Sequence, residues 1–390
     1  MDFKKLLPLY IGAIIGPLGG FGMVPVIPGL AQEWSVPFQK ASLAITAYMA
    51  PFIVIQIFSG SFAQLFQVRK TLLFGFSVYA LGALLCGLSP GLWPLLTSRL
   101  VQGTGAGFLS PVIMASIGEL VSRKHMGKAI GLLGMAYTTG VTLGPALSGI
   151  IDVHFGWPVF FHVLAGLSLL AGFLYLMSSE PASKDKKIRT NPVDILPILG
   201  SALREPGIFY LSFAAFSFFV AYMGIMTFMA DHFQTMLNLS SDRVGTLLSV
   251  TGFSGIIVSP IAGFLGDRLG RKKVFLAGAA VALFTIGLMI RIPYAFSAYL
   301  LLFLVLGTGS AAAWTSLNTM AVECSAPLRQ PVTSLYNAIK FSGYALSPVL
   351  LSFLYVPFSL TAVQFGCMGS IFIAACLAIR YKKIRALNTM

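Results

Sequence analysis

Long apolar stretches recur from one end of the chain to the other, and they restrict the possible folds more than any other feature of the sequence. A helix that crosses about 30 Å of hydrocarbon needs about 20 mostly apolar residues. Stretches of this length, separated by charged residues or by Pro and Gly, occupy residues 8–30, 42–65, 71–89, 93–119, 128–150, 157–178, 207–230, 244–266, 274–291, 295–320, 331–353 and 358–379. The sequence therefore predicts an all-α membrane protein with twelve transmembrane helices.

The composition excludes most soluble classes of protein. Of the 390 residues, 57% are hydrophobic and 10% are charged, against about 25% charged residues in an average soluble domain. In water such a chain would expose large apolar patches, whereas lipid matches them. The sequence contains no Ser-His-Asp set, no cluster of metal ligands and no phosphate-binding glycine loop. We therefore expect neither an enzyme nor a bound metal or cofactor.

The basic residues flank the apolar stretches and form no soluble basic face. The formal net charge is +14, but without such a face we expect no binding of nucleic acid. With the N-terminus inside, most Lys and Arg residues fall on the cytoplasmic side, and only Lys40, Arg243 and Arg291 fall outside. The positive-inside bias then predicts a multi-pass protein of the bacterial inner (cytoplasmic) membrane, surrounded by membrane lipids, with both termini in the cytoplasm. The basic start and first apolar stretch are also typical of a signal peptide, but the later stretches favour a first transmembrane helix.

The longest polar stretch lies in the middle of the chain and predicts a cytoplasmic linker at residues 180–206. It separates an N-terminal half, residues 1–179, from a C-terminal half, residues 207–390. A shift of about 204 positions superposes Gly103-Thr104-Gly105 on Gly307-Thr308-Gly309, which indicates an internal repeat. The halves are therefore predicted to be two pseudo-symmetric bundles of six helices. In such folds the substrate site lies between the bundles near the bilayer midplane, and one half rocks against the other.

Three motifs carry a resemblance to a known family. They are TSRLVQGTGAG at residues 97–107, GVTLGPALSG at residues 140–149 and GFLGDRLGRKK at residues 263–273. With these motifs on the fourth, fifth and eighth predicted helices, the whole chain resembles the major facilitator superfamily, and within it the twelve-helix drug:proton antiporters. The resemblance implies a proton-coupled antiporter that carries out efflux of small amphipathic compounds or drugs by alternating access.

The motif at residues 263–273 predicts a conformational latch on the cytoplasmic side. Asp267 ends the eighth helix, and the symmetry of the halves brings it to the N-terminal end of the fifth, where a carboxylate is favoured by about 0.3–1 kcal/mol. Arg271, four residues further on, can hold Asp267 in place, and Gly263 opens the motif. The alternative is that these residues only anchor a loop to anionic headgroups. In the N-terminal half the signature's acid is replaced by Gln64, so the latch of that half is predicted to be uncharged.

The fifth predicted helix carries a run of small residues around a proline. Gly140, Gly144 and Gly149 permit close packing of helices, and Pro145 frees a backbone carbonyl. Packing alone is one interpretation of these residues. The other, which the exporter resemblance implies, is that a stiff, kinked helix seals the central cavity against leak.

Two charged residues lie inside predicted helices, where an Arg costs about 2.5–3.5 kcal/mol to insert. Arg99 is implied by the resemblance to act in proton coupling or binding, and the alternative is that it ties helices together or snorkels outward. Lys340 lies near mid-membrane, and no Asp or Glu lies in the middle of a predicted span to pair with it. Its partner is then an anionic or zwitterionic cargo, unless burial keeps Lys340 neutral or helix-backbone carbonyls bind it.

The remaining site residues are expected near the substrate or the proton. Asp231 and His162 join Arg99 as candidates for proton coupling, because coupling needs a group that changes its charge. Tyr222 and Met226 are candidates for an adaptable wall of the substrate site. The leading interpretation is a proton-coupled exporter of small amphipathic compounds that works as a monomer. The alternative is an organic-anion or zwitterion carrier or exchanger that uses Arg99 and Lys340.

Overall fold

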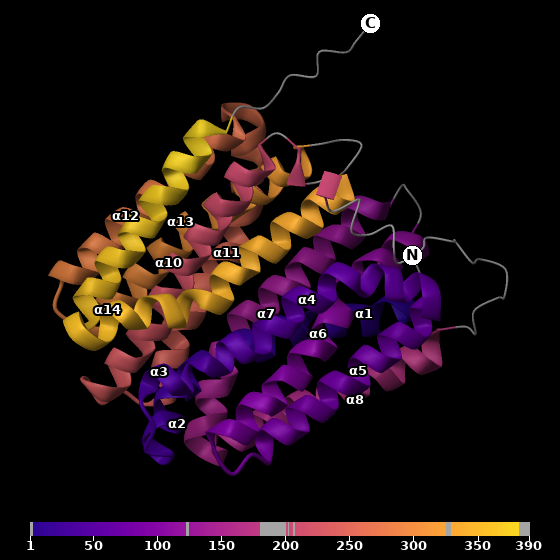
Figure 1. Cartoon of the computed structure of the whole chain (residues 1–390), viewed down its shortest axis with the longest axis horizontal. Coiled ribbons are helices and arrows are strands. Elements are labelled where there is room, and N and C mark those ends of the chain that lie inside the picture. The colour runs from indigo at the N-terminus through magenta and orange to yellow at the C-terminus, as the bar shows by residue number, and fades with distance from the viewer. Residues whose placement is uncertain are drawn as a thin grey trace, which may run out of the picture. The chain divides into compact units, whose positions relative to one another are not determined.

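The computed structural model describes residues 3–121, 125–179, 200–201, 203–205, 207–324 and 329–381. It describes the side chains in these ranges except at residues 3–4, 59–66, 118–119, 126–128, 130–131 and 329–331. Most of the predicted linker, residues 180–206, lies outside the described residues. Every regular element in the described part of the chain is a helix (Figure 1). The elements are α1 (Phe3–Phe21), η1 (Val24–Val26), α2 (Ile27–Glu33), α3 (Phe38–Ala41), α4 (Leu43–Phe66), α5 (Val68–Gly87), α6 (Leu92–Leu120), α7 (Met126–Phe155), α8 (Trp157–Ser178), α10 (Ile208–Thr235), α11 (Ser241–Leu269), α12 (Arg271–Arg291), α13 (Phe296–Val322) and α14 (Arg329–Arg380).

Ten helices of the described residues are long and apolar enough to cross a membrane. The chain is thus an all-helical, multi-pass membrane protein. The tenth of these spans, Val332–Arg380, passes through Ser359, whose φ of 74° and ψ of −176° interrupt the helical backbone. The last two predicted helices, 331–353 and 358–379, therefore fall in a single element, and the arrangement of twelve spans in two halves stays a prediction.

Proline breaks the first predicted helix, 8–30, into three pieces. The α-helix α1 ends at Phe21, a single 3₁₀ turn spans Val24–Val26, and α2 starts at Ile27. Pro25 and Pro28 each occupy one of the first positions of η1 and α2, where the missing backbone N–H costs no hydrogen bond. The physical effect of these prolines is to start new helical turns here.

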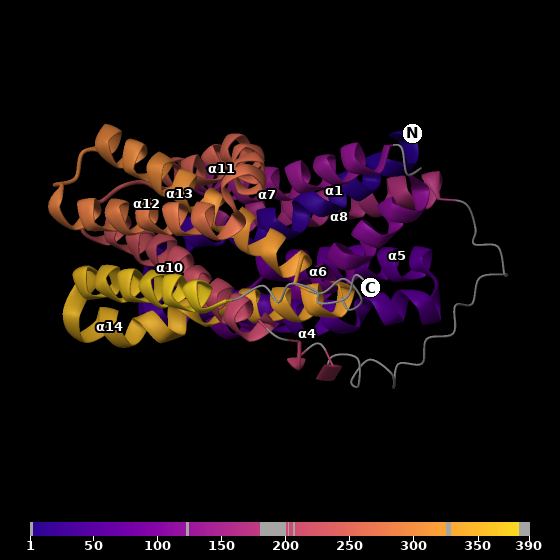
Figure 2. The same cartoon turned by 90° about the horizontal axis from the view of Figure 1, so that it is seen from above.

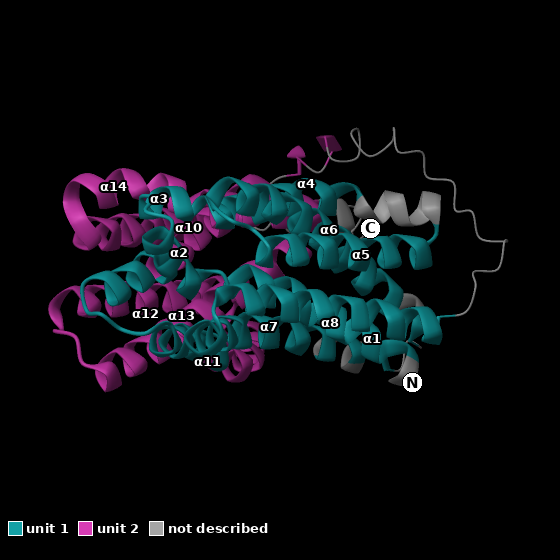
Figure 3. Cartoon of the chain, turned by 90° about the horizontal axis from the view of Figure 1, so that it is seen from below, with its two compact units in different colours: residues 1–191, 226–253 teal, residues 192–225, 254–390 magenta. Residues whose placement is uncertain are grey.

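Contacts between residues group the chain into two compact units (Figure 3). Unit 1 contains residues 1–191 and 226–253, and unit 2 contains residues 192–225 and 254–390. In unit 1, α6 packs against α4 and α5, α5 packs against α8, and α1 packs against α7. In unit 2, α13 lies beside α12, as both views show (Figures 1 and 2), and α14 packs against both. Each unit therefore has its own buried apolar core, and the predicted boundaries 1–179 and 207–390 stay a prediction.

Candidate functional site

A buried lysine on α14 is the centre of a polar cluster in unit 2. The side chain of Lys340 is only 7% exposed. Its Nζ donates to Oδ1 of Asn337, at 2.8 Å, and to Oδ1 of Asn318, at 3.4 Å. The hydroxyl of Tyr336 also donates to Oδ1 of Asn318, at 2.9 Å. Asn337 lies one helical turn before Lys340 on α14, and Asn318 comes from α13, so the cluster joins two helices.

Three aromatic rings lie close to the Lys340 amine. Its Nζ lies 4.6 Å from the ring centroid of Phe341, 5.3 Å from that of Tyr336 and 5.6 Å from that of Phe219. Rings attract a cation within about 6 Å of their centroids through their quadrupole, most strongly over the ring face. Trp314 extends the group, because its ring packs at 6.3 Å from Phe219 and edge-on at 5.4 Å from Tyr222. These five rings come from α10, α13 and α14, and we call them the aromatic shell: Phe219, Tyr222, Trp314, Tyr336 and Phe341.

The electrostatics of the lysine cluster are unbalanced. No ion pair joins Lys340 to a carboxylate within the described ranges, so its partners are neutral amide oxygens and rings. Of the alternatives open from the sequence, bonding to helix-backbone carbonyls is not seen, because both oxygens belong to side chains. A buried charge is normally balanced by a counter-ion. Binding of an anionic or zwitterionic cargo by this cluster stays a prediction.

Arg99 lies in unit 1 and is completely buried on α6. Its Nε donates to the carbonyl oxygen of Ala44 on α4, at 3.2 Å. Its Nη1 donates to the carbonyl oxygen of Gly19 on α1, at 3.2 Å, and to Oε1 of Gln102, at 2.7 Å. The guanidinium also lies 4.3 Å from the ring centroid of Tyr48. Arg99 thus ties α1, α4 and α6 together, as one of the two interpretations of its sequence position expected.

The hydrogen bonds of Arg99 do not satisfy every polar atom in its surroundings. Nη2 of Arg99 and Nε2 of Gln102 are buried and have no hydrogen-bond partner among the described residues. Close to them, the hydroxyl of Tyr79 donates to the carbonyl oxygen of Ile15. The thiol of Cys86 donates weakly, over 3.8 Å, to the same Gln102 oxygen that Arg99 binds. Arg99 therefore sits among neutral partners, and its role in proton coupling stays a prediction.

The other predicted proton and substrate residues are distributed over several helices. Asp231 is buried in α10, and the half-buried ring of His162, on α8, lies against Gly87 at the end of α5. Tyr222 belongs to the aromatic shell of unit 2. Met226, also buried on α10, begins the stretch 226–253 that is grouped with unit 1. Among the described residues, no group of three or more His, Cys, Asp or Glu side chains could hold a metal ion.

The glycines of α7 allow two other segments of unit 1 to come very close. A Cβ added at Gly140 would lie 2.4 Å from the carbonyl oxygen of Ile14, and one at Gly144 would lie 2.8 Å from that of Leu18, so this face packs on α1. A Cβ added at Gly149 would lie 2.3 Å from the carbonyl oxygen of Ser241, at the start of α11. Close packing, the first interpretation of these residues, is thus present, and sealing stays a prediction.

Pro145 takes part in the same contact. A Cβ added at Gly245 of α11 would lie 2.2 Å from the carbonyl oxygen of Pro145. The same oxygen accepts a hydrogen bond from the hydroxyl of Ser148, at 3.1 Å. Glycines on both helices thus let the backbones of α7 and the first turns of α11 touch within unit 1.

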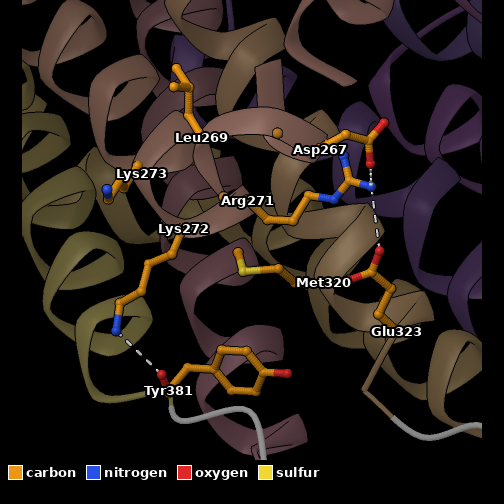
Figure 4. Close-up of a pocket in the computed structure, with 10 residues that line it drawn as sticks. Asp267, Leu269, Arg271, Lys272, Lys273, Met320, Glu323 and Tyr381 are labelled. Carbon is orange, nitrogen blue, oxygen red and sulfur yellow. Dashed lines mark hydrogen bonds and ion pairs between the residues drawn. The ribbon is translucent and has the colours of Figure 1, made fainter. Parts of the chain in front are cut away.

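The connection between α11 and α12 brings the predicted latch residues together in unit 2. Nη2 of Arg271 lies 2.5 Å from Oδ1 of Asp267 and 3.4 Å from Oε1 of Glu323, at the end of α13 (Figure 4). Nη1 of Arg271 donates to the carbonyl oxygen of Gly263, at 2.8 Å. Asp267 is 67% exposed, so its ion pair is worth less than about 1 kcal/mol in water. Arg271 therefore acts mainly as a geometric brace from α12 to α11 and α13.

Two glycines shape this connection. Gly270 has a φ of 96°, which favours glycine, and it lets α12 start directly after α11 ends. A Cβ added at Gly266 would lie 2.8 Å from Nη1 of Arg271, so Gly266 leaves room for the brace. In the N-terminal half, Gln64 lies in α4, but its side chain is outside the described residues.

A pocket of about 520 Å³ opens beside the brace. Its lining includes Arg271, Lys272, Glu323 and Tyr381 (Figure 4). Nζ of Lys272 donates to the backbone carbonyls of Ile379 and Tyr381, where positive charge at a helix C-terminus is favourable. Burial raises the pKa of Tyr381 to about 12, so its phenol stays neutral near pH 7.

Several residues of the Lys340 cluster and of the Arg271 brace were not predicted from the sequence. Asn337 is the partner that spacing reveals, because a polar residue three positions before a buried lysine shares its helix face. Asn318 and Trp314 come from another helix, and nothing local in the sequence connects them with Lys340. Glu323 comes at the end of α13, and nothing local in the sequence connects it with Arg271.

Comparison with known proteins gives a consistent set of relatives. The family model of the Major Facilitator Superfamily matches residues 9–242 and 211–387. The riboflavin transporter RibZ of Clostridioides difficile (strain 630) is 23% identical over 317 residues, which cover 70% of this chain and 70% of RibZ. The MFS-type transporter YwfA of Bacillus subtilis (strain 168) is 23% identical over 397 residues, covering 98% and 93% of the two chains. The multidrug resistance protein Stp of Mycobacterium tuberculosis (strain CDC 1551 / Oshkosh) is 23% identical over 348 residues, covering 76% and 65%. With ten helices able to cross a membrane and a family match over almost its whole length, the chain belongs to the Major Facilitator Superfamily.

Proposed function

We propose that the chain is a secondary active transporter that moves small amphipathic organic compounds by alternating access, through twelve spans in two six-helix halves. Ten described helices are long enough to cross the membrane. The break at Ser359 would let α14 cross twice, and α7, with 30 residues, has the length of a further span. These helices would give the twelve crossings that the apolar stretches predict.

The orientation and coupling belong to the same proposal. The positive-inside bias supports cytoplasmic termini, and the bacterial relatives support the inner membrane. The resemblance to drug:proton antiporters supports protons as the coupling ion, with Asp231, His162 and Arg99 as candidates. We further propose a monomer in which Asp267, Arg271, Gly263 and Gln64 latch the cytoplasmic side. Packing of Gly140, Gly144, Pro145 and Gly149 would seal the cavity.

The observation that carries this proposal is the buried Lys340 amine with neutral partners only. A positive charge at this depth is costly unless something offsets it. The amide oxygens of Asn318 and Asn337 satisfy it in part, and a carboxylate on the cargo would satisfy it more fully. An anionic or zwitterionic cargo is therefore favoured over a lipophilic cation, which Lys340 would repel.

A second candidate function is proton-driven efflux of drugs. The glycine and proline motif of α7 supports it, because the motif is the one that the exporter resemblance rests on. The name of the relative Stp, a multidrug resistance protein, points in the same direction. The two candidates differ in the charge of the cargo that Lys340 accepts.

The proposal is tested by counterflow in proteoliposomes with an imposed pH gradient, using a panel of organic anions, zwitterions and cationic drugs. Lys340→Ala should abolish transport of anions, while Lys340→Arg should restore it only in part, because a planar guanidinium binds a carboxylate in a different geometry. Lys40→Ala, at an exposed lysine, is the matched control. If Lys340→Ala transports anions as the parent does, Lys340 is structural. If no compound of the panel is transported, the proposed function is wrong.

A further inference from the structure

The polar side chains of the Lys340 cluster, which are Lys340, Asn318 and Asn337, offer hydrogen-bond donors and almost no free acceptor. An ammonium has three N–H donors, and two of those on Lys340 are directed at Asn337 and Asn318. Oδ1 of Asn318 also accepts from Tyr336, so both of its lone pairs are used. The amide nitrogens of Asn318 and Asn337 have no partner within the described ranges, and both side chains are partly exposed. One ammonium N–H and two amide groups therefore remain for a ligand rich in acceptors.

The sequence spacing places an aromatic residue on the same helix face as each of the two asparagines. On α13, Trp314 lies four residues before Asn318, and on α14, Phe341 lies four residues after Asn337. Residues four apart lie on the same face of a helix. Phe219 and Tyr222, three apart on α10, complete the shell. Three helices thus contribute aromatic side chains close to the Lys340 cluster.

Two pairs of rings in the aromatic shell pack edge-on, whereas Phe219 and Trp314 are tilted at 41°. Tyr222 meets Trp314 at an interplanar angle of 81°, and Phe219 meets Phe341 at 81° with centroids 6.0 Å apart. Edge-to-face and offset pairs gain attraction beyond the area they bury, because the positive ring edge meets the negative ring face. A saturated ring of the same size buries similar area but lacks this quadrupole. The shell should therefore prefer an aromatic ring.

We propose that the cargo is an aromatic carboxylate, an inference that rests on the proposed function and narrows its substrate class. The carboxylate oxygens accept from the Lys340 ammonium and from the amide groups of Asn318 and Asn337. The aromatic ring packs against Trp314 and Phe341. Trp314 is then the residue that sets ring specificity, and Lys340 is the one that sets charge specificity.

Three probes test the preference for an aromatic ring separately from the preference for a carboxylate. Binding of 2-naphthoate, decahydro-2-naphthoate and 2-naphthylmethanol is measured by calorimetry on the purified full chain in detergent. The aromatic acid should bind about 2- to 13-fold more tightly than the saturated acid, which is the range for one aromatic pair. It should bind at least about tenfold more tightly than the alcohol, because hydrogen bonds to a charged group are lost.

Variants assign the two preferences to their residues. Trp314→Leu should remove the preference for the aromatic acid over the saturated acid and keep the preference for acid over alcohol. Lys340→Gln should do the reverse. Trp93→Leu, at a tryptophan that is 70% exposed in the other unit, is the matched control and should change neither ratio. Phe341→Leu replaces Trp314→Leu if the latter does not fold, as judged by its melting curve.

The outcomes distinguish this inference from the proposed function. Equal binding of 2-naphthoate and decahydro-2-naphthoate, or loss of both preferences in the Trp93→Leu control, would overturn the aromatic assignment. Binding of none of the three probes would overturn it as well. In each of these cases the proposed transport function stands if the counterflow panel shows movement of another compound, and it fails only if that panel shows none.

Discussion

The two buried basic residues differ in what their neighbours leave unsatisfied. Arg99 binds two backbone carbonyls and Gln102, so its main bonds are internal to unit 1. Lys340 binds two partly exposed amide side chains, and its third N–H has no hydrogen-bond partner among the described residues. The sequence identifies both charges, because Arg and Lys are rare in apolar stretches. It does not identify their partners, since Gly19, Ala44 and Asn318 reach them only through packing of separate helices.

Replacement of Arg99 by alanine should destabilise the protein. Three donated hydrogen bonds and the contact with Tyr48 would be lost, at a cost on the order of 3 kcal/mol. Arg99→Lys should recover part of this, because an ammonium can bind Gln102 but cannot span two carbonyls in the same plane. Melting curves in detergent measure the effect, with Lys340→Ala as the comparison. A normal melting curve with lost proton coupling would instead show that Arg99 acts in coupling and not as a tie.

At the scale of elements, the apolar stretches predict where helices lie, and breaks inside them are harder to predict. The stretch 157–178 coincides with α8, and 244–266 lies inside α11. The interruption at Ser359 lies close to the predicted break between 331–353 and 358–379, but its exact position is not predictable, because a serine at positive φ is held there by its surroundings. The brace of Arg271 was partly predictable, since its four-residue spacing from Asp267 is local. Its contact with Glu323 depends on how α12 packs on α13.

Replacement of Asp267 by asparagine should leave expression intact and lower transport. Arg271 would keep the carbonyl of Gly263 and its contact with Glu323 but lose its ionic partner on α11. Under the proposed latch, the outward-open state would then be populated less. Labelling of single cysteines from each side of the membrane reports the populations, and Asp242→Asn serves as the control. An unchanged labelling pattern together with normal transport would exclude a latch role.

At the scale of the whole molecule, contacts divide the chain within its longest polar stretch, between residues 191 and 192, and also between 225 and 226 and between 253 and 254. Residues 226–253 are grouped with the N-terminal residues, because this segment touches α7 at backbone distance. Gly252 shows the same approach, since an added Cβ would lie 2.5 Å from Oγ1 of Thr142. The repeat follows from the positions of residues in the sequence, whereas the grouping follows from contacts between packed helices. The grouping was therefore not predictable from the sequence, because it depends on how α7 and α11 pack.

Under the proposed transport function, the neutral partners of Lys340 have a consequence for the return step of the cycle. A carrier whose buried charge is balanced only by its cargo is trapped when empty, and it can then only exchange one molecule for another. Here the oxygens of Asn318 and Asn337 and the rings of the aromatic shell solvate the ammonium without cargo. The empty protein should thus reorient, so that efflux from loaded vesicles proceeds into cargo-free buffer. The double variant Asn318→Leu with Asn337→Leu should slow this net efflux more than it slows exchange. If net efflux and exchange are slowed equally, the two amides do not stabilise the empty state.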